Sequence, residues 1–284
     1  MKFGVNTLIW SAAYDSTVED VLPIIKSKGF DGIELPIFRP DAVDVARVRR
    51  GMEANGLEPN VASVFVDGLS LISPDRDIRR QSVERLRSLI TVTAEVGATC
   101  IAGPLYSPVG YLPGRRRTAD EWAWAIEGLQ QVGDVLTDSG VTLAIEPLNR
   151  FETFFLNTAA DAAALADEVA HPNIGILYDT FHANIEEKNI AAGLLHVGKH
   201  VKLIHTCEND RGTPGTGHVE WSEVFAAIRA IEYDGWLTIE SFGFAIGELS
   251  AAAAIWRDIE ADPASIAYDG VRFLRQGLGM FAAQ

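Results

Sequence analysis

Residues 142–179 read TLAIEPLNRFETFFLNTAADAAALADEVAHPNIGILYD. Two short apolar runs, residues 142–147 and 174–179, flank a segment whose apolar residues recur with a helical period. Thr158 and Asp161 have the spacing of a helix N-terminus at the start of that segment. A strand, a helix and a second strand in this order predict one unit of a parallel sheet.

The same unit recurs on both sides of this stretch. The predicted strands are residues 3–7, 32–37, 58–65, 99–104, 142–147, 174–179, 201–206 and 236–241. Glycines that end helical segments stand at Gly29, Gly56, Gly97 and Gly140. Capping-box spacing is also found for Ser16 with Glu19 and for Thr118 with Glu121. Each of these signals marks a helix boundary between two strands.

Eight units without an intervening linker favour a closed (β/α)8 TIM barrel, with residues 1–284 forming one domain. The alternative is an open doubly wound sheet, which carries a glycine-rich phosphate loop after its first strand. Here the first strand continues into Asn6-Thr7-Leu8-Ile9-Trp10, which contains no glycine. The sequence therefore predicts the barrel.

Composition excludes several classes of partner. The 24 basic and 39 acidic residues give a net charge of −15, which repels nucleic acids and anionic lipid surfaces. Cys100 and Cys207 have no CxxC spacing, so neither a disulfide framework nor a structural zinc site is predicted. The sequence contains no signal-peptide pattern and no apolar run of membrane-spanning length. We expect a cytoplasmic protein with no membrane or nucleic-acid partner.

Four consecutive predicted strands carry a polar residue at their carboxyl end or one position before it. These residues are Glu146, Asp179, His205 and Glu240. In a barrel, such positions lie at the catalytic rim, because the preceding residues fill the interior. Strand alternation places an inner layer beneath them, formed by Ala144, Leu177, Leu203 and Thr238. The strand ends thus predict a cluster of three carboxylates and one imidazole.

Three carboxylates at the half-buried end of a barrel raise one another's pKa unless a cation neutralises them. Carboxylate oxygens with one imidazole nitrogen suit a hard divalent ion. We expect Mn²⁺, with Mg²⁺ and Co²⁺ as alternatives. For any one of these residues alone, the competing interpretation is a side chain hydrogen-bonded to a neighbouring loop.

At these residues the sequence resembles the ketose 3-epimerases, the D-tagatose and D-psicose 3-epimerase family of xylose-isomerase-like TIM barrels. The matching segments are IEPLNRFE (145–152), YDTFHANIEE (178–187), HTCENDR (205–211), GTGHV (215–219) and IESF (239–242). Their order and spacing agree with the family over the C-terminal half, whereas residues 1 to about 100 agree mainly in fold pattern.

The resemblance implies roles for seven residues. Glu146, Asp179, His205 and Glu240 would bind the metal. Glu146 and Glu240 would also exchange the proton at C3 of a free ketose through a cis-enediolate. Glu152, His182 and Arg211 would hold the sugar around its C1 and C2 oxygens. The substrate would be of the D-tagatose, D-psicose, D-fructose or L-ribulose type, and the family commonly forms homodimers or homotetramers.

Each supporting residue has a simpler interpretation. His182 would be a surface or hydrogen-bonding residue of a loop. Arg211 would pair with its acidic neighbours in solvent, and Glu152 would be an ordinary loop carboxylate.

Other functions remain open at this point. An aldose–ketose, inosose or hydroxypyruvate-type isomerase would use the same enediolate chemistry, but at the carbon next to the one that a 3-epimerase inverts. An endonuclease IV-like phosphodiesterase would need more histidines than the six present and a basic surface. A sugar-binding protein without catalysis would not need a carboxylate pair that exchanges protons.

Overall fold

The computed structural model describes residues 1–242 and 253–280. In this part of the chain, eight parallel strands form a closed barrel in sequential order, β1 to β8. The strands are β1 (Lys2–Asn6), β2 (Gly32–Pro36), β3 (Glu58–Ala62), β4 (Cys100–Gly103), β5 (Thr142–Ile145), β6 (Ile174–Asp179), β7 (Val201–His205) and β8 (Trp236–Ile239). The pairing of β1 with both β2 and β8 closes the ring. The predicted TIM barrel is confirmed.

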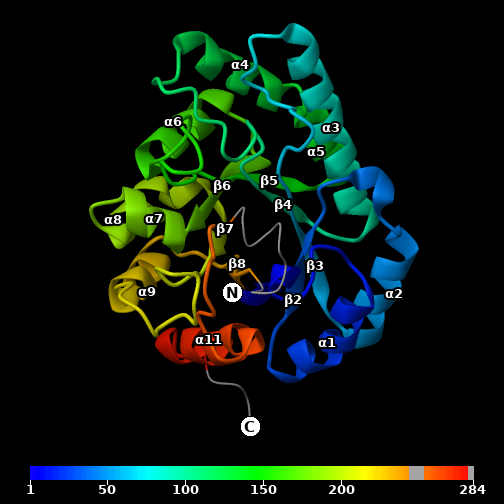
Figure 1. Cartoon of the computed structure of the whole chain (residues 1–284), viewed down its shortest axis with the longest axis vertical. Coiled ribbons are helices and arrows are strands. Elements are labelled where there is room, and N and C mark those ends of the chain that lie inside the picture. Colours follow the sequence, from blue (N-terminus) through cyan, green and yellow to red (C-terminus); the bar gives the residue numbers. More distant parts are fainter. Residues whose placement is uncertain (243–252, 281–284) are drawn as a thin grey trace.

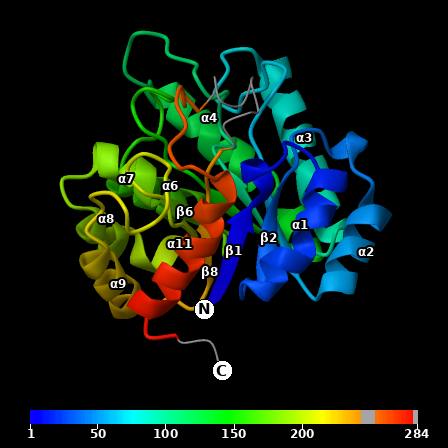
Figure 2. The same ribbon diagram turned by 60° about the horizontal axis from the view of Figure 1, so that its bottom comes forward.

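Helices surround the barrel (Figure 1). They are α1 (Ser16–Ser27), α2 (Val45–Asn55), α3 (Arg76–Glu95), α4 (Ala119–Gln130), α5 (Gly133–Ser139), α6 (Ala159–Val169), α7 (Thr180–Glu186), α8 (Ile190–Val197), α9 (Trp221–Ala230) and α11 (Pro263–Gly277). Short 3-10 helices are η1 (Thr7–Ile9), η2 (Pro40–Ala42) and η3 (Gly198–His200). The last helix, α11, packs against β8 beside the first strand (Figure 2). Among the described helices, none has both the length and the apolar character of a membrane span.

Most helix-end predictions hold. Thr118 and Glu121 form a complete capping box at α4, and Thr158 caps α6 by accepting a hydrogen bond from the Asp161 backbone N–H. The prediction for α1 is wrong by one residue, because Asp15 rather than Ser16 is the N-cap. The Asp15 carboxylate accepts from the N–H groups of Thr17 and Val18. An ionised side chain at this position satisfies free N–H groups and also interacts favourably with the helix dipole.

Two kinds of core support the barrel. The large core lies between strands and helices and contains alternate residues such as Phe3, Ile33 and Ile176. The interior is filled by a smaller cluster formed by Cys100, Ala102, Ala144, Leu177, Leu203 and Trp236. This cluster includes three of the four predicted inner residues, and the fourth, Thr238, is also fully buried. The barrel is therefore packed below its mouth. We use "mouth" for the end at which the strands have their carboxyl termini.

Several strands are shorter than predicted. For example, β3 ends at Ala62 rather than at residue 65, and β8 ends at Ile239 rather than at residue 241. Beyond these points the chain leaves the hydrogen-bonded ladder and forms the loops of the mouth. Glu146 and Glu240 therefore lie one residue beyond their strands, where a side chain can point across the opening.

Candidate functional site

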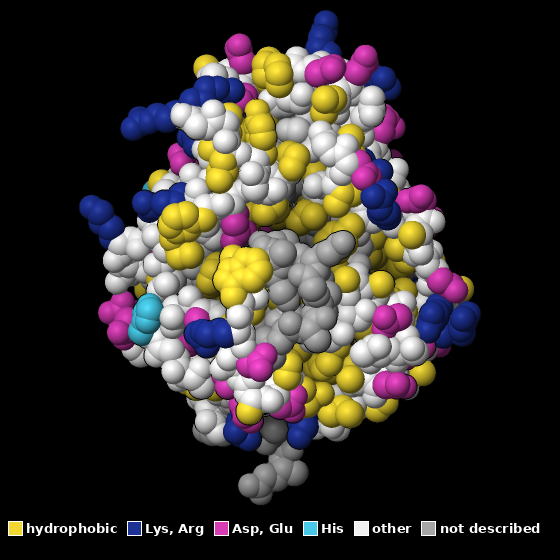
Figure 3. Space-filling model, in the orientation of Figure 1, with side chains coloured by type: hydrophobic (Ala, Val, Ile, Leu, Met, Phe, Trp, Pro, Cys, Tyr) yellow, Lys and Arg dark blue, Asp and Glu magenta, His cyan; other side chains and the backbone are white. Residues whose placement is uncertain are grey.

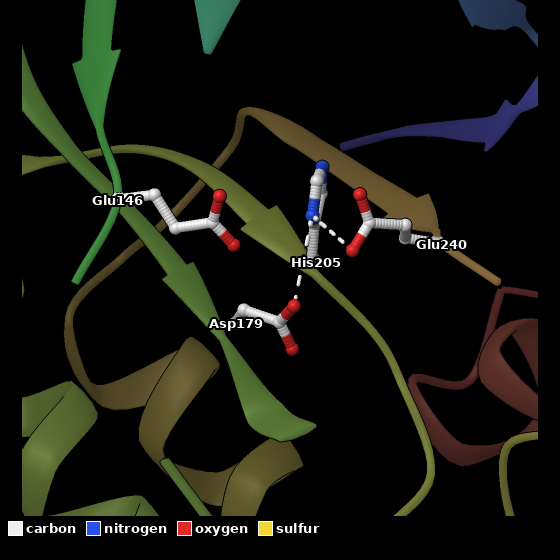
Figure 4. A group of neighbouring side chains, drawn as sticks. All are labelled: Glu146, Asp179, His205 and Glu240. Atoms are coloured by element: carbon white, nitrogen blue, oxygen red, sulfur yellow. Dashed lines mark ion pairs between the residues drawn. The ribbon is translucent and has the colours of Figure 1, made fainter. Parts of the chain in front are cut away.

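The four strand-end residues meet at the mouth. Figure 4 shows the side chains of Glu146, Asp179, His205 and Glu240 directed toward a common centre. Each offers one potential ligand atom, and these atoms lie within 4.8 Å of one another. The Nδ1 atom of His205 is 3.4 Å from Oε2 of Glu240 and 3.8 Å from Oδ2 of Asp179. Strands β5 to β8 thus deliver one polar group each to a single point.

The three carboxyl groups of this cluster differ in proton affinity. Burial raises the pKa of Glu146 well above its usual value, and the nearby Glu240 raises it further. For Asp179, burial also favours a higher pKa, but Arg211 and His205 outweigh it and lower the pKa. For Glu240, burial is likewise outweighed, by His205 and Arg211, and the pKa is lowered. Two carboxyl groups with opposite shifts are a common feature of acid/base sites.

The cluster has the chemistry of a divalent metal site. Nδ1 of His205 is buried and makes no hydrogen bond within the described residues, although buried polar atoms are almost always paired. It faces the carboxylate oxygens of Glu240 and Asp179. An unpaired imidazole nitrogen beside carboxylate oxygens fits an ion that accepts both N and O ligands. These four residues can hold a divalent ion.

Arg211 lies inside the cluster instead of in solvent. Its Nη1 donates to Oδ2 of Asp179 and Oε2 of Glu240, both at 2.8 Å, and the residue is only 4% exposed. The guanidinium carbon lies 4.0 Å from the ring centroid of Phe181. The interpretation as a solvated partner of its neighbours in sequence is therefore wrong. Its backbone φ of 66° lies in the left-handed region.

His182 and Glu152 are linked through a residue that the sequence analysis did not single out. The backbone N–H of Asn149 donates to Nδ1 of His182 at 3.1 Å. The Asn149 side-chain amide donates to Oε1 of Glu152 at 2.7 Å. His182 is buried, and its Nε2 lies 3.2 Å from Nη2 of Arg211. The three residues that resemblance assigns to the substrate are thus next to the four-residue cluster.

A cavity of about 160 Å³ opens above the cluster. Its polar lining contains Glu146, Glu152, His182, His205, Arg211 and Glu240. Its apolar lining includes Leu8, Phe38, Val109, Leu148 and Phe242. On the β3–β4 side the wall consists of small residues, among them Ala62 and Gly103. Hydrophobic side chains also border a hollow on the face seen in Figure 3. The cavity therefore offers both polar and apolar contacts to a small ligand.

Glu34 is a second residue that sequence reasoning missed. It lies in the middle of β2 and is fully buried. Its carboxylate contacts Nε2 of His205, with 3.0 Å to Oε1, and accepts a hydrogen bond from the Asn6 side-chain amide. The available signal was one charged residue within the apolar run Gly-Ile-Glu-Leu-Pro. A charge in a strand with both faces buried needs a partner.

Glu208 organises the loop that carries Arg211. This buried carboxylate accepts hydrogen bonds from the backbone N–H groups of Asn209, Gly215 and Val219 and from Nε1 of Trp221. The loop between β7 and α9 therefore folds around one carboxylate.

Glu208→Gln is expected to lower the free energy of unfolding by about 1–3 kcal/mol, because an amide group would face N–H donors in a buried position. Denaturant unfolding monitored by circular dichroism measures this loss. Glu220→Gln is the control, since Glu220 is exposed. An equal, small effect of both substitutions would contradict the role of Glu208 in this loop.

The chain has clear relatives among known proteins. A family model described as the xylose isomerase-like TIM barrel matches residues 22–276. A probable ketose 3-epimerase from Synechocystis sp. is 38% identical over 276 residues, which cover 97% of this chain and 96% of the relative. A ketose 3-epimerase from Arthrobacter globiformis is 31% identical over 282 residues, which cover 98% and 97%.

Solved structures agree with this relationship. A D-allulose 3-epimerase from Methylomonas sp. superposes with a TM-score of 0.93 at 30% identity and covers 98% of both chains. A second structure of a D-allulose 3-epimerase from Methylomonas sp., in complex with D-allulose, has a TM-score of 0.92 at 29% identity and covers 97% of this chain and 96% of that one. The chain therefore belongs to the ketose 3-epimerase family of xylose isomerase-like TIM barrels, which is a family of isomerases.

Proposed function

We propose that the protein is a metal-dependent epimerase that inverts C3 of a free ketose. The observation that carries this proposal is the placement of Glu146 and Glu240, whose carboxyl groups face each other from opposite sides of the cluster (Figure 4). Inversion requires that a proton leave one face of the carbon and return to the other. Two carboxyl groups on opposite sides of a small cavity meet this requirement.

The metal would be held by Glu146, Asp179, His205 and Glu240. When bound, a divalent cation polarises the ketose carbonyl and stabilises negative charge on the neighbouring oxygens. The ligand set supports Mn²⁺ as the ion, with Mg²⁺ or Co²⁺ as alternatives.

Glu146 and Glu240 would act as the acid/base pair. One carboxylate takes the C3 proton, which leaves a cis-enediolate, and the other carboxyl group returns a proton from the opposite face. The roles exchange in the reverse reaction.

Glu152, His182 and Arg211 would bind the C1 and C2 oxygens. Arg211 offers N–H donors from within the cluster, and Glu152 offers acceptor oxygens at the cavity wall. His182 lies between them. These groups would fix one end of the sugar, so that C3 lies between the two glutamates.

A free ketose is favoured over a phosphorylated one. Three consecutive arginines, residues 115–117, carry the kind of charge that attracts a phosphate group. Arg115 instead pairs with Glu121, and Arg117 pairs with Asp161. These pairs compete with phosphate binding. The names of the relatives, which include L-ribulose and D-psicose 3-epimerases, support substrates of the D-tagatose, D-psicose, D-fructose or L-ribulose type.

Further proposals concern the state of the protein in the cell. We propose a cytoplasmic homodimer or homotetramer in which residues 1–284 form one domain. The net charge of −15 supports the absence of a nucleic-acid partner.

Proton NMR in D₂O with added Mn²⁺ and a series of ketoses tests the function. We expect loss of the C3 proton signal together with appearance of the C3 epimer. A product that is an aldose would favour an aldose–ketose isomerase instead. If no ketose exchanges its C3 proton or changes configuration, the proposal fails.

A further inference from the structure

A buried contact crosses the mouth from β2 to β7. Nε2 of His205 lies 3.0 Å from Oε1 and 3.2 Å from Oε2 of Glu34, a residue 171 positions away in the sequence. The side chains of both residues are at most 1% exposed. Because water does not compete at this depth, the contact determines how the imidazole is oriented.

Asn6 fixes the other side of the Glu34 carboxylate. The Oδ1 atom of Asn6 accepts a hydrogen bond from the backbone N–H of Leu8 at 2.9 Å, which caps η1. The Asn6 Nδ2 group must then point away from that N–H, and it donates to Oε1 of Glu34 at 2.7 Å. Asn6 and Glu34 are also paired residues in the β1–β2 ladder. The carboxylate is therefore held in place from its own side of the barrel.

This arrangement decides which nitrogen of His205 carries the proton. A carboxylate only accepts hydrogen bonds, so Nε2 must be the donor to Glu34. In the neutral imidazole, the lone pair then belongs to Nδ1. Nδ1 is the atom that faces Asp179 and Glu240 and makes no hydrogen bond within the described residues.

We infer that Glu34 is a positioning residue that holds His205 in the Nε2–H tautomer, so that the Nδ1 lone pair is directed at the metal. The inference rests on the proposed function, because it assigns Glu34 a part in the same metal site. A carboxylate behind a metal-binding histidine fixes the ring and increases its basicity. Nothing in the local sequence of β2 assigns this part to Glu34.

Glu34→Gln tests the inference. Glutamine removes the negative charge and replaces one of the two oxygens that face Nε2 with an N–H₂ group, so it holds the Nε2–H tautomer less strongly. Isothermal titration of the metal-free protein with Mn²⁺ should show about 10–100-fold weaker binding than wild type. The Mn²⁺ concentration for half-maximal epimerase activity should rise by the same factor.

Glu121→Gln is the matched control. Glu121 is also a buried glutamate, but it belongs to the capping box of α4 and pairs with Arg115. This substitution should leave the affinity for Mn²⁺ unchanged. If the role of Glu34 were purely structural, Glu34→Gln would lower the thermal stability but leave the affinity of the folded protein for Mn²⁺ unchanged.

The tautomer itself gives a second readout that needs no variant. Long-range ¹H–¹⁵N correlation spectra of wild-type protein loaded with diamagnetic Mg²⁺ should show that the single proton of the His205 ring is on Nε2, the nitrogen that faces Glu34. A lone proton on Nδ1, or a Glu34→Gln variant that binds Mn²⁺ within twofold of wild type, would overturn the inference. Wild-type protein that binds no Mn²⁺ at all would instead remove the metal site of the proposed function.

Discussion

Glu146→Gln is expected to slow C3 epimerisation by about 10²–10⁴-fold, the usual contribution of a general acid or base. Glutamine retains an oxygen that can still be a metal ligand, but it cannot exchange a proton at that position. Glu146 is buried, but glutamine is nearly the same size as glutamate, so the fold should persist. Glu240→Gln should have an effect of similar size, because the reaction needs one proton transfer on each face of the carbon.

Epimerisation is measured by product formation, and proton transfer by loss of the C3 proton signal in D₂O. Each variant should still exchange the C3 proton of the epimer whose proton faces the remaining glutamate, while inversion is lost. Glu168→Gln is the control, since Glu168 is exposed on α6 and its side chain accepts a hydrogen bond from Nε1 of Trp122, away from the mouth. Wild-type epimerisation rates in both the Glu146 and the Glu240 variant would contradict the assigned acid/base pair.

Arg211→Met is expected to lower the free energy of unfolding of the metal-free protein by about 3–5 kcal/mol, which is typical for removal of one partner from a buried ion pair. The guanidinium group of Arg211 contacts both Asp179 and Glu240. Without it, these carboxylates would repel each other in a site that excludes water. Urea unfolding in the presence of a chelator measures the loss, and Mn²⁺ should recover part of it.

Arg272→Met is the matched control for this substitution. Arg272 pairs with Asp269 on the surface of α11, where the two side chains are 68% and 51% exposed. An exposed pair of this kind contributes about 0.2–1 kcal/mol. If Arg211→Met cost no more than Arg272→Met, the buried cluster would not depend on the guanidinium for its charge balance.

The strand order and the four-residue cluster were accessible from sequence because their signals are local. An apolar run that ends on Glu146 or Asp179 is visible without knowledge of the fold. Once eight such runs imply a barrel, the geometry of the barrel places the ends of neighbouring strands together. The start of α1 was misplaced because Asp15 and Ser16 are both good N-cap residues, and only the backbone conformation distinguishes them.

The parts that sequence could not supply depend on contacts between distant segments. Glu34 appears as one charged residue in an apolar strand, and its partner His205 lies on the other side of the barrel mouth. Arg211 stands among acidic neighbours in the sequence, but its guanidinium group contacts Asp179 and Glu240 instead. Neither the partner nor the direction follows from residue spacing.

A crystal structure of protein prepared with Mn²⁺ and without chelator, with anomalous diffraction data, is the most direct measurement of the central claim. The account predicts one anomalous peak in the mouth, in contact with side-chain atoms of Glu146, Asp179, His205 and Glu240. A mouth without an anomalous peak, or a peak that contacts other residues, would contradict it.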